Sequence, residues 1–170
     1  MKSADRRAEI TRRVADHILA YGLDASSLRP LAKAAGTSDR MLLYYFEDKA
    51  DLTTAALTFI MANLVAILNA RTLKTLRPLD ELRPALLKII FADDLWPYLR
   101  LWLEIASLAA KGDPFYHATG HQIANGFLAW GAAQLDSENP ETDAAKLLIG
   151  IEGAVLLKSV GLDDVIARAG

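Results

Sequence analysis

Hydrophobic residues recur every three or four positions along most of the chain, the spacing that places side chains on one face of an α-helix. Sustained alternation of apolar and polar residues, which is typical of a half-buried strand, is absent. Ala and Leu are frequent, and runs of β-branched residues are few. The pattern therefore predicts an all-α fold, and a chain of 170 residues is long enough to bury a hydrophobic core.

The first helix is predicted over residues 4–21, with Ile10, Val14 and Ile18 on its apolar face. Gly22 follows, and glycine ends helices well because it adopts the left-handed conformation required there without steric strain. The arginines of this helix lie largely off the apolar face, so most of them are expected to serve solubility. The helix is expected to pack across the next two and complete a three-helix unit.

Residues 26–49, SSLRPLAKAAGTSDRMLLYYFEDK, carry the most specific pattern in the chain, two short helices joined by a glycine turn. A hydroxyl at Ser26 or Ser27 can cap the first helix by accepting a hydrogen bond from an early N–H group. Gly36 follows the apolar stripe of this helix and is suited to end it. The stripe comprises Leu28, Leu31, Ala32 and Ala35.

The second short helix is predicted over residues 40–46, with Leu42, Leu43 and Phe46 turned inward. A pair of short helices at a tight turn is typical of a helix-turn-helix, whose second helix enters the major groove of DNA. Three side chains that can cap a helix precede the second one, those of Thr37, Ser38 and Asp39.

The run LRPLAKAAGTSDRMLLYYFEDKADL resembles the DNA-binding segment of TetR-family transcriptional repressors. In that family a small-Gly-x-Ser turn leads to a recognition helix that closes on an aromatic residue, and a lysine follows. The resemblance covers about the first third of the chain, and the remainder is similar only as a helical domain of roughly suitable size. Leu43 stands where the family most often has a tyrosine, and Glu47 and Asp48 are acidic where DNA is approached. The matching positions are Ala35, Gly36, Ser38, Phe46, Lys49 and Leu52.

The resemblance implies a transcriptional regulator, a repressor that binds a palindromic operator in double-stranded DNA as a homodimer and is released by a small-molecule effector. Residues 1–48 are then expected to form a three-helix helix-turn-helix DNA-binding domain. Residues 49–170 are expected to form a helical effector-binding and dimerisation domain. No catalytic activity and no cofactor are implied.

The expected DNA-binding surface follows from the same resemblance. Phosphate contacts set the register of a protein on DNA, and base contacts set its sequence preference. Arg40 is the strongest candidate for reading a base, because a guanidinium can form two hydrogen bonds with one guanine. The expected phosphate contacts are Ser27, Tyr44, Tyr45 and Lys49, the other base contacts are Thr37, Ser38 and Met41, and Arg29 and Asp39 complete the surface.

Aromatic residues in the second part of the chain either form plain core or line a ligand pocket. Because TetR-like proteins bind effectors inside their C-terminal domain, the resemblance favours the pocket. Glu104 supports it, since a carboxylate among apolar neighbours must be paired, exposed or beside a cavity. His117 and His121 share a helical face but lack a third metal ligand nearby, so pocket or ordinary polar roles are favoured over a metal site. The aromatic candidates are Phe59, Phe91, Trp96, Tyr98 and Trp102.

Proline, glycine and acidic residues predict where the later helices begin and end. Pro78 and Pro84 interrupt the helical pattern, and Asp93 with Asp94 is suited to cap a helix that begins near Trp96. Two stop-and-restart signals then predict helices over residues 115–135 and 141–160. These signals are Gly112-Asp113-Pro114 and Asn139-Pro140-Glu141.

Small residues are frequent inside the last two long helices. Each interior glycine costs about 1 kcal/mol relative to alanine, so close packing of helices is expected. Packing across a two-fold axis agrees with the four-helix dimer interface of the resembled family, and packing within one subunit is the alternative. The candidate interface residues are Gly120, Ala124, Phe127, Gly131, Gly150, Gly153, Ala154 and Leu157.

Residues 52–70 carry no charge, and a stretch of this length raises the question of a membrane span. Thr and Asn side chains interrupt it and no basic cluster flanks it, so a buried helix is favoured. Asp48, with Asp51 three residues later, is suited to cap this helix. No membrane association is expected.

The net charge of −2 is unevenly distributed. Residues 1–50 hold nine Lys/Arg and seven Asp/Glu, a balance of +2, and residues 51–170 hold ten and fourteen, a balance of −4. A small positive region is sufficient for a module that docks through a few phosphates. Cysteine is absent, which excludes disulfides and thiolate metal sites, and the first residues lack a signal-peptide pattern, so a cytoplasmic location is expected. The alternative function is an all-helical ligand-binding protein or enzyme without DNA binding.

Overall fold

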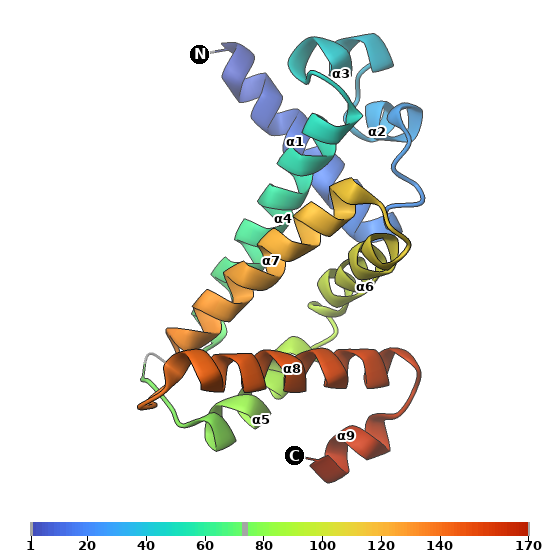
Figure 1. Cartoon of the computed structure of the whole chain (residues 1–170). Coiled ribbons are helices and arrows are strands. Elements are labelled where there is room, and N and C mark those ends of the chain that lie inside the picture. The colour runs from blue at the N-terminus through green and yellow to red at the C-terminus, as the bar shows by residue number, and fades with distance from the viewer. Residues whose placement is uncertain (1, 73–74, 170) are drawn as a thin grey trace. The chain divides into compact units, whose positions relative to one another are not determined.

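The computed structural model describes residues 2–72 and 75–169. In this part of the chain it contains nine α-helices and no strand beyond one isolated parallel bridge between Arg77 and Leu135 (Figure 1). The predicted all-α fold is confirmed. The helices are α1 (Lys2–Tyr21), α2 (Leu28–Ala34), α3 (Asp39–Tyr45), α4 (Lys49–Arg71), α5 (Leu79–Ile90), α6 (Trp96–Ala110), α7 (Pro114–Ala132), α8 (Pro140–Ser159) and α9 (Asp163–Ala169).

The chain forms two compact units, Met1–Ala66 and Ile67–Gly170, and the boundary between them lies inside α4. The functional boundary predicted from the sequence, between residues 48 and 49, coincides with the start of α4. This division into functional domains stays a prediction.

The first unit is built around one face of α1. Ile10, Val14 and Ile18 are fully buried, as the spacing of apolar residues predicted. Leu31 of α2 and Leu42 of α3 are fully buried as well, so all three helices share one core. That core fixes the positions of the two short helices.

Two glycines end helices of the first unit, as predicted. Gly22 follows α1 with φ of +82°, and Gly36 follows α2 with φ of +64°. The predicted side-chain cap of α2 is wrong. Ser27 occupies the capping position, but its side chain accepts no capping bond. The hydroxyl of Ser26 is buried and donates instead to the carbonyl of Leu23.

The uncharged helix α4 is long and apolar enough to cross a membrane by length and composition alone. A row of its apolar side chains, however, is buried inside the protein, whereas Thr54, Thr58 and Asn63 are exposed. Other apolar side chains of α4, such as Phe59 and Val65, are half-buried. The buried row comprises Leu52, Ala56, Ile60, Leu64 and Leu68, and Thr53 and Leu57 are buried beside it.

In the second unit α7 packs against both α6 and α8, and α5 packs against α8 (Figure 1). Asp113 caps α7 as predicted, because its carboxylate accepts the N–H groups of Phe115 and Tyr116. The last segment, Asp163–Ala169, is a short helix. One core cluster joins α5, α8 and the segment between α7 and α8 through Leu82, Leu86, Leu135, Ala144 and Leu147.

Two expectations in this unit are wrong. Pro84 does not interrupt the pattern but lies inside α5, six residues from its start. Neither Asp93 nor Asp94 caps α6, whose first turn follows Leu95 without a side-chain cap. Asp94 instead forms a two-bond ion pair with Arg71 at the end of α4. The Arg71 guanidinium lowers the pKa of the Asp94 carboxyl group, and the carboxylate raises the pKa of Arg71.

Candidate nucleic-acid interface

The helix α3 is held on the first unit by one buried face and presents the opposite face to solvent. Leu42 and Phe46 are no more than 2% exposed, whereas Met41 is 40% and Tyr44 is 74% exposed. The N-terminal end is fixed because the hydroxyl of Ser38 accepts the N–H of Met41 at 3.3 Å, which confirms a predicted cap. A seven-residue helix held in this way offers its outer face as a rigid surface.

The predicted inward orientation of Leu43 is wrong. Its side chain is 49% exposed. Leu42 and Phe46, four residues apart, already occupy the strip that faces the core, and a side chain one residue after Leu42 is rotated by about 100° from that strip. Leu43 therefore lies beside Tyr44 on the outer surface of α3.

The turn between α2 and α3 contains an arginine from α1. Arg13 donates to the carbonyl of Ala35 at 3.4 Å. Gly36 is favoured for its positive φ, and a Cβ atom added there would lie 2.8 Å from the Arg13 guanidinium and displace the end of that side chain. Sequence reasoning assigned Arg13 to the surface and missed this contact.

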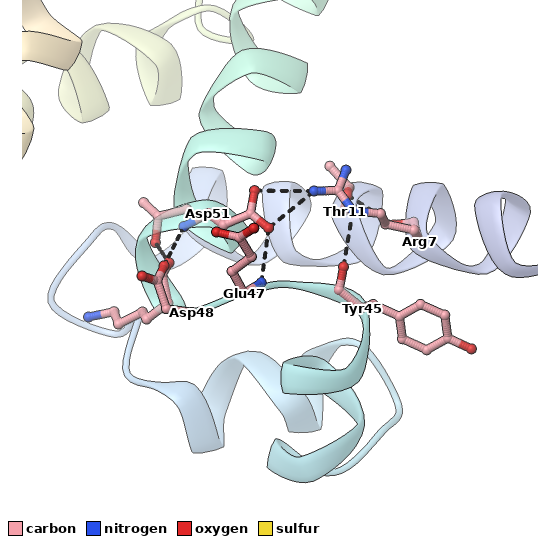
Figure 2. A network of polar contacts seen from close by, with 8 residues as sticks. Arg7, Thr11, Tyr45, Glu47, Asp48 and Asp51 are labelled. Carbon is pink, nitrogen blue, oxygen red and sulfur yellow. Dashed lines mark hydrogen bonds and ion pairs between the residues drawn. The ribbon is translucent and has the colours of Figure 1, made fainter.

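A second arginine of α1 joins the end of α3 to the start of α4, as Figure 2 shows. Arg7 donates through Nε to the carbonyl of Tyr45 at 3.1 Å and through Nη2 to both carboxylate oxygens of Asp51, at 3.2 and 3.3 Å. Its guanidinium also lies over the ring of Phe46, 4.5 Å from the centroid. We call these contacts of Arg7 and Asp51 the α3–α4 clamp.

Asp51 is also part of the cap of α4 (Figure 2). Its N–H donates to Oδ1 of Asp48 at 2.8 Å, and its Oδ2 accepts the N–H of Glu47 at 3.2 Å. Asp48 therefore caps α4, as the sequence predicted, and Asp51 reaches back to Glu47, one residue before the capping position. Three consecutive linker residues, Phe46 to Asp48, are therefore held by the clamp or by the cap, and Lys49 begins α4 with its side chain exposed.

Charge is distributed unevenly over the first unit. The four arginines of α1 are all paired with acids: Arg6 and Arg13 with Glu9, Arg7 with Asp51, and Arg12 with Asp16. The exposed cations of α2, α3 and the start of α4 have no ion-pair partner among the residues that the structure describes. These unpaired cations are Arg29, Lys33, Arg40 and Lys49.

The residues predicted to contact DNA all lie at the surface of the first unit. Thr37 and Tyr45 are half-buried and the others are exposed. The rings of Tyr44 and Tyr45 contact each other edge to face, with centroids 5.1 Å apart. The individual roles of these residues stay predictions. The exposed members are Ser27, Arg29, Ser38, Asp39, Arg40, Met41, Tyr44 and Lys49.

The predicted pocket residues are dispersed. Phe59 belongs to the first unit, and the others lie in the second. Phe91 and Trp96 flank the ammonium of Lys158, whereas His117 and His121 are exposed on α7. No group of three metal-binding side chains occurs among the described residues. Tyr98 and Glu104 are half-buried on α6, and their pocket role stays a prediction.

Trp102, another of the predicted pocket residues, joins α6 to α8. Its Nε1–H donates to Oε2 of Glu152 at 2.7 Å. Burial raises the pKa of Glu152, an effect that the Trp102 hydrogen bond partly offsets. The contact accounts for Trp102 through packing between helices and does not require a ligand.

The small residues of α7 and α8 divide into two groups. A Cβ atom at Gly120 would lie 3.6 Å from Ile105, and one at Gly131 would lie 3.5 Å from Leu147, so these glycines allow close packing within the subunit. Gly153 is exposed and has no neighbour within 4 Å. Ala154 is buried, and the other candidates are half-buried, namely Ala124, Phe127, Gly150 and Leu157.

Comparison with known proteins supports this assignment of the helix-turn-helix. Residues 13–56, which include α2, α3 and the start of α4, match the model of bacterial regulatory proteins of the tetR family. A search of curated proteins finds no match.

Solved structures share the fold over nearly the whole chain. A provisionally assigned TetR-family transcriptional regulator from Rhodococcus sp. has a TM-score of 0.73 and 20% identity, and the similarity covers 99% of this chain and 95% of that one. A provisionally assigned regulator from Streptomyces coelicolor A3(2), SCO7518, has a TM-score of 0.68, 25% identity and 96% coverage of both chains. A transcriptional regulator from Rhodococcus sp. Rha1 has a TM-score of 0.68 and 20% identity, covering 95% and 83%.

The helix-turn-helix and the match of residues 13–56 to the tetR family model support the predicted resemblance to TetR-family transcriptional regulators. The solved structures show that the chain shares the fold of such regulators.

We predict that Arg7→Ala and Asp51→Asn each weaken DNA binding by roughly two- to fivefold, because an exposed ion pair contributes up to about 1 kcal/mol to the geometry it fixes. Fluorescence anisotropy with a DNA fragment selected by the wild-type protein measures the change. Arg12→Ala is the matched control, since its pair with Asp16 is confined to α1. If Arg7 acted instead by touching a phosphate, Asp51→Asn would strengthen binding by removing a negative charge.

Proposed function

We propose that the protein is a repressor that binds a palindromic operator as a homodimer and that a small effector releases it. The observation that carries the proposal is the outer face of α3, where Arg40, Met41 and Tyr44 are exposed beside cations that form no ion pair with any described residue. A rigid helix with a free guanidinium at its start suits insertion into a major groove. A cytoplasmic location follows, since the operator lies there.

Within this interface the N-terminal end of α3 would contact bases and the C-terminal end would contact phosphates. Thr37, Ser38, Arg40 and Met41 lie at its N-terminal end, which is the end that contacts base edges in helix-turn-helix proteins. Tyr45 is the last residue of α3 and Lys49 is the first residue of α4, and both are proposed to contact phosphates. Phosphate contacts at this end fix the register from which Arg40 reads a base.

The homodimer is supported by an apolar stripe on α8. Ile149, Leu156 and Val160 are 73%, 56% and 64% exposed, and Gly153 lies between them with open space around it. Their spacing of four, three and four residues places them on one helical face. A second copy related by a two-fold axis would cover this stripe with the same surface and allow close helix approach at Gly153. Of the interface glycines predicted from the sequence, Gly153 belongs to the proposed interface. Gly120 and Gly131 do not, because they pack against side chains of their own subunit.

The two-fold axis also explains why one helix per subunit is sufficient. A single α3 reads only a few base pairs, and two copies related by symmetry read two half-sites of a palindrome. Release by an effector requires that the effector bind more tightly to the dimer conformation that does not fit DNA. A ligand-binding protein without DNA binding remains the competing function, and the next experiment separates the two.

We predict that Arg40→Ala relaxes sequence preference at one position of each half-site, with a loss of about 1–3 kcal/mol on the preferred sequence. Lys49→Ala should weaken binding to all sequences equally and reduce the slope of log affinity against log salt by about 0.9. Selection of DNA from a random library, followed by anisotropy at several salt concentrations, measures both effects. Lys111→Ala, an exposed lysine of the second unit, is the control. Absence of DNA binding by the wild-type protein would refute the proposal.

We predict that Leu156→Asp converts the dimer into a monomer, because it places a carboxylate at the centre of the apolar stripe. Sedimentation velocity should show twice the mass of one chain for the wild-type protein and a single chain for the variant. Leu76→Asp is the control, since Leu76 is 59% exposed and lies outside α8. A wild-type protein that stays monomeric at all concentrations would contradict the dimer.

A further inference from the structure

The second unit contains a pocket of about 130 Å³ that no predicted site residue lines. It lies between the end of α4 with the segment after it, one face of α5, and Gln134 just beyond α7. The α5 side is apolar and is formed by Leu82, Leu86 and Ile89. The other lining residues carry hydrogen-bonding groups, among them Thr72 and Gln134. The lining of the pocket thus combines apolar side chains from α5 with polar side chains from the segments around it.

Two arginines line the pocket, and they differ in whether an acidic side chain pairs with them. Arg71 is neutralised by its two-bond pair with Asp94. Arg77 is half-buried, and its guanidinium has no hydrogen-bond or ion-pair partner in the described part of the chain. The pocket consequently carries one positive charge that the described residues do not compensate.

The position of Arg77 is fixed by its backbone. Its N–H donates to the carbonyl of Gln134 at 3.1 Å, and its carbonyl accepts the N–H of Asp136 at 2.8 Å. These bonds tie the segment before α5 to the segment after α7. A guanidinium on such an anchored backbone loses less freedom on binding an anion than one on a loose loop.

We propose that this pocket binds a short-chain carboxylate, with the carboxylate on Arg77 and the hydrocarbon chain against Leu82, Leu86 and Ile89. A planar guanidinium matches a carboxylate through two parallel hydrogen bonds. The volume sets the chain length, since a cavity of about 150 Å³ holds a benzene molecule of six non-hydrogen atoms. A four-carbon monocarboxylate such as butyrate has the same number.

The charge and the apolar lining together favour a ligand with an anionic end and a hydrocarbon end. Inorganic phosphate would use Arg77 but not the apolar side chains of α5. A neutral molecule of the same size would use those side chains but not the guanidinium of Arg77.

Because the pocket borders the end of α4, we take its ligand to be the effector, a step that rests on the proposed function. Arg71 and Thr72 end or follow α4, the helix whose first turn is held by the α3–α4 clamp. A ligand held by Arg77 also contacts Arg71 and Thr72, and so adds contacts at the end of α4. The helix α4 therefore begins just after α3 and ends at residues that line the pocket.

The test is isothermal titration calorimetry of the full chain, without DNA, in a buffer free of carboxylates and phosphates. Sodium butyrate, butyramide and inorganic phosphate are titrated separately. We expect saturable binding of butyrate only, weakened at least about tenfold in Arg77→Gln because a charged hydrogen-bond partner is lost. Lys88→Gln removes the same charge from an exposed position of α5 and should bind butyrate like the wild type.

Equal binding of butyramide or phosphate, no binding of butyrate, or unchanged binding in Arg77→Gln would overturn the proposal. The melting temperature of Arg77→Gln should equal that of the wild type, because its side chain supports no other described residue. DNA binding is then measured with and without butyrate. Failure of the calorimetry leaves DNA binding intact, whereas failure of DNA binding leaves the calorimetric result intact, so the two proposals fail separately.

Discussion

The DNA-binding surface depends on the burial of two side chains, Leu42 and Phe46, beneath α3. A helix of seven residues is not stable by itself, because its few hydrogen bonds do not offset the unfavourable free energy of helix nucleation. Its shape therefore comes from tertiary contacts: the core below it, the Ser38 cap at its start and Arg7 on the carbonyl of Tyr45 at its end. Every exposed residue of α3 has its direction set by these three restraints.

The same contacts resolve an apparent conflict between net charge and function. A chain with a net charge of −2 gives no general attraction to a polyanion. The arginines of α1, however, form ion pairs within the first unit. Arg29, Arg40 and Lys49 form no ion pair with any described residue. Attraction to DNA is therefore expected to be local to the cations of α2, α3 and the start of α4.

Local signals in the sequence were sufficient for the helices and for much of the site. The glycine at position 36, the cap at Ser38 and the Asp48–Asp51 pair each act within four residues, so their structures could be predicted. The contact between Arg7 and Asp51 spans 44 residues, and no periodic pattern encodes it. The pocket lined by Arg77 and α5 could not be predicted from the sequence for the same reason, because the nearness of these residues depends on the folded chain.

The helix α4 gives the two proposed sites a physical connection. It is a single helix of 23 residues, about 34 Å long at 1.5 Å per residue, and its buried apolar face resists bending. A ligand can shift it only by preferring one of its positions over another. A carboxylate bound to Arg77 would also contact Arg71 and Thr72, and a difference in these contacts between two positions of α4 would supply such a preference. The absence of charge between residues 52 and 70 is consistent with this role, because an apolar face can slide over a core without breaking ion pairs.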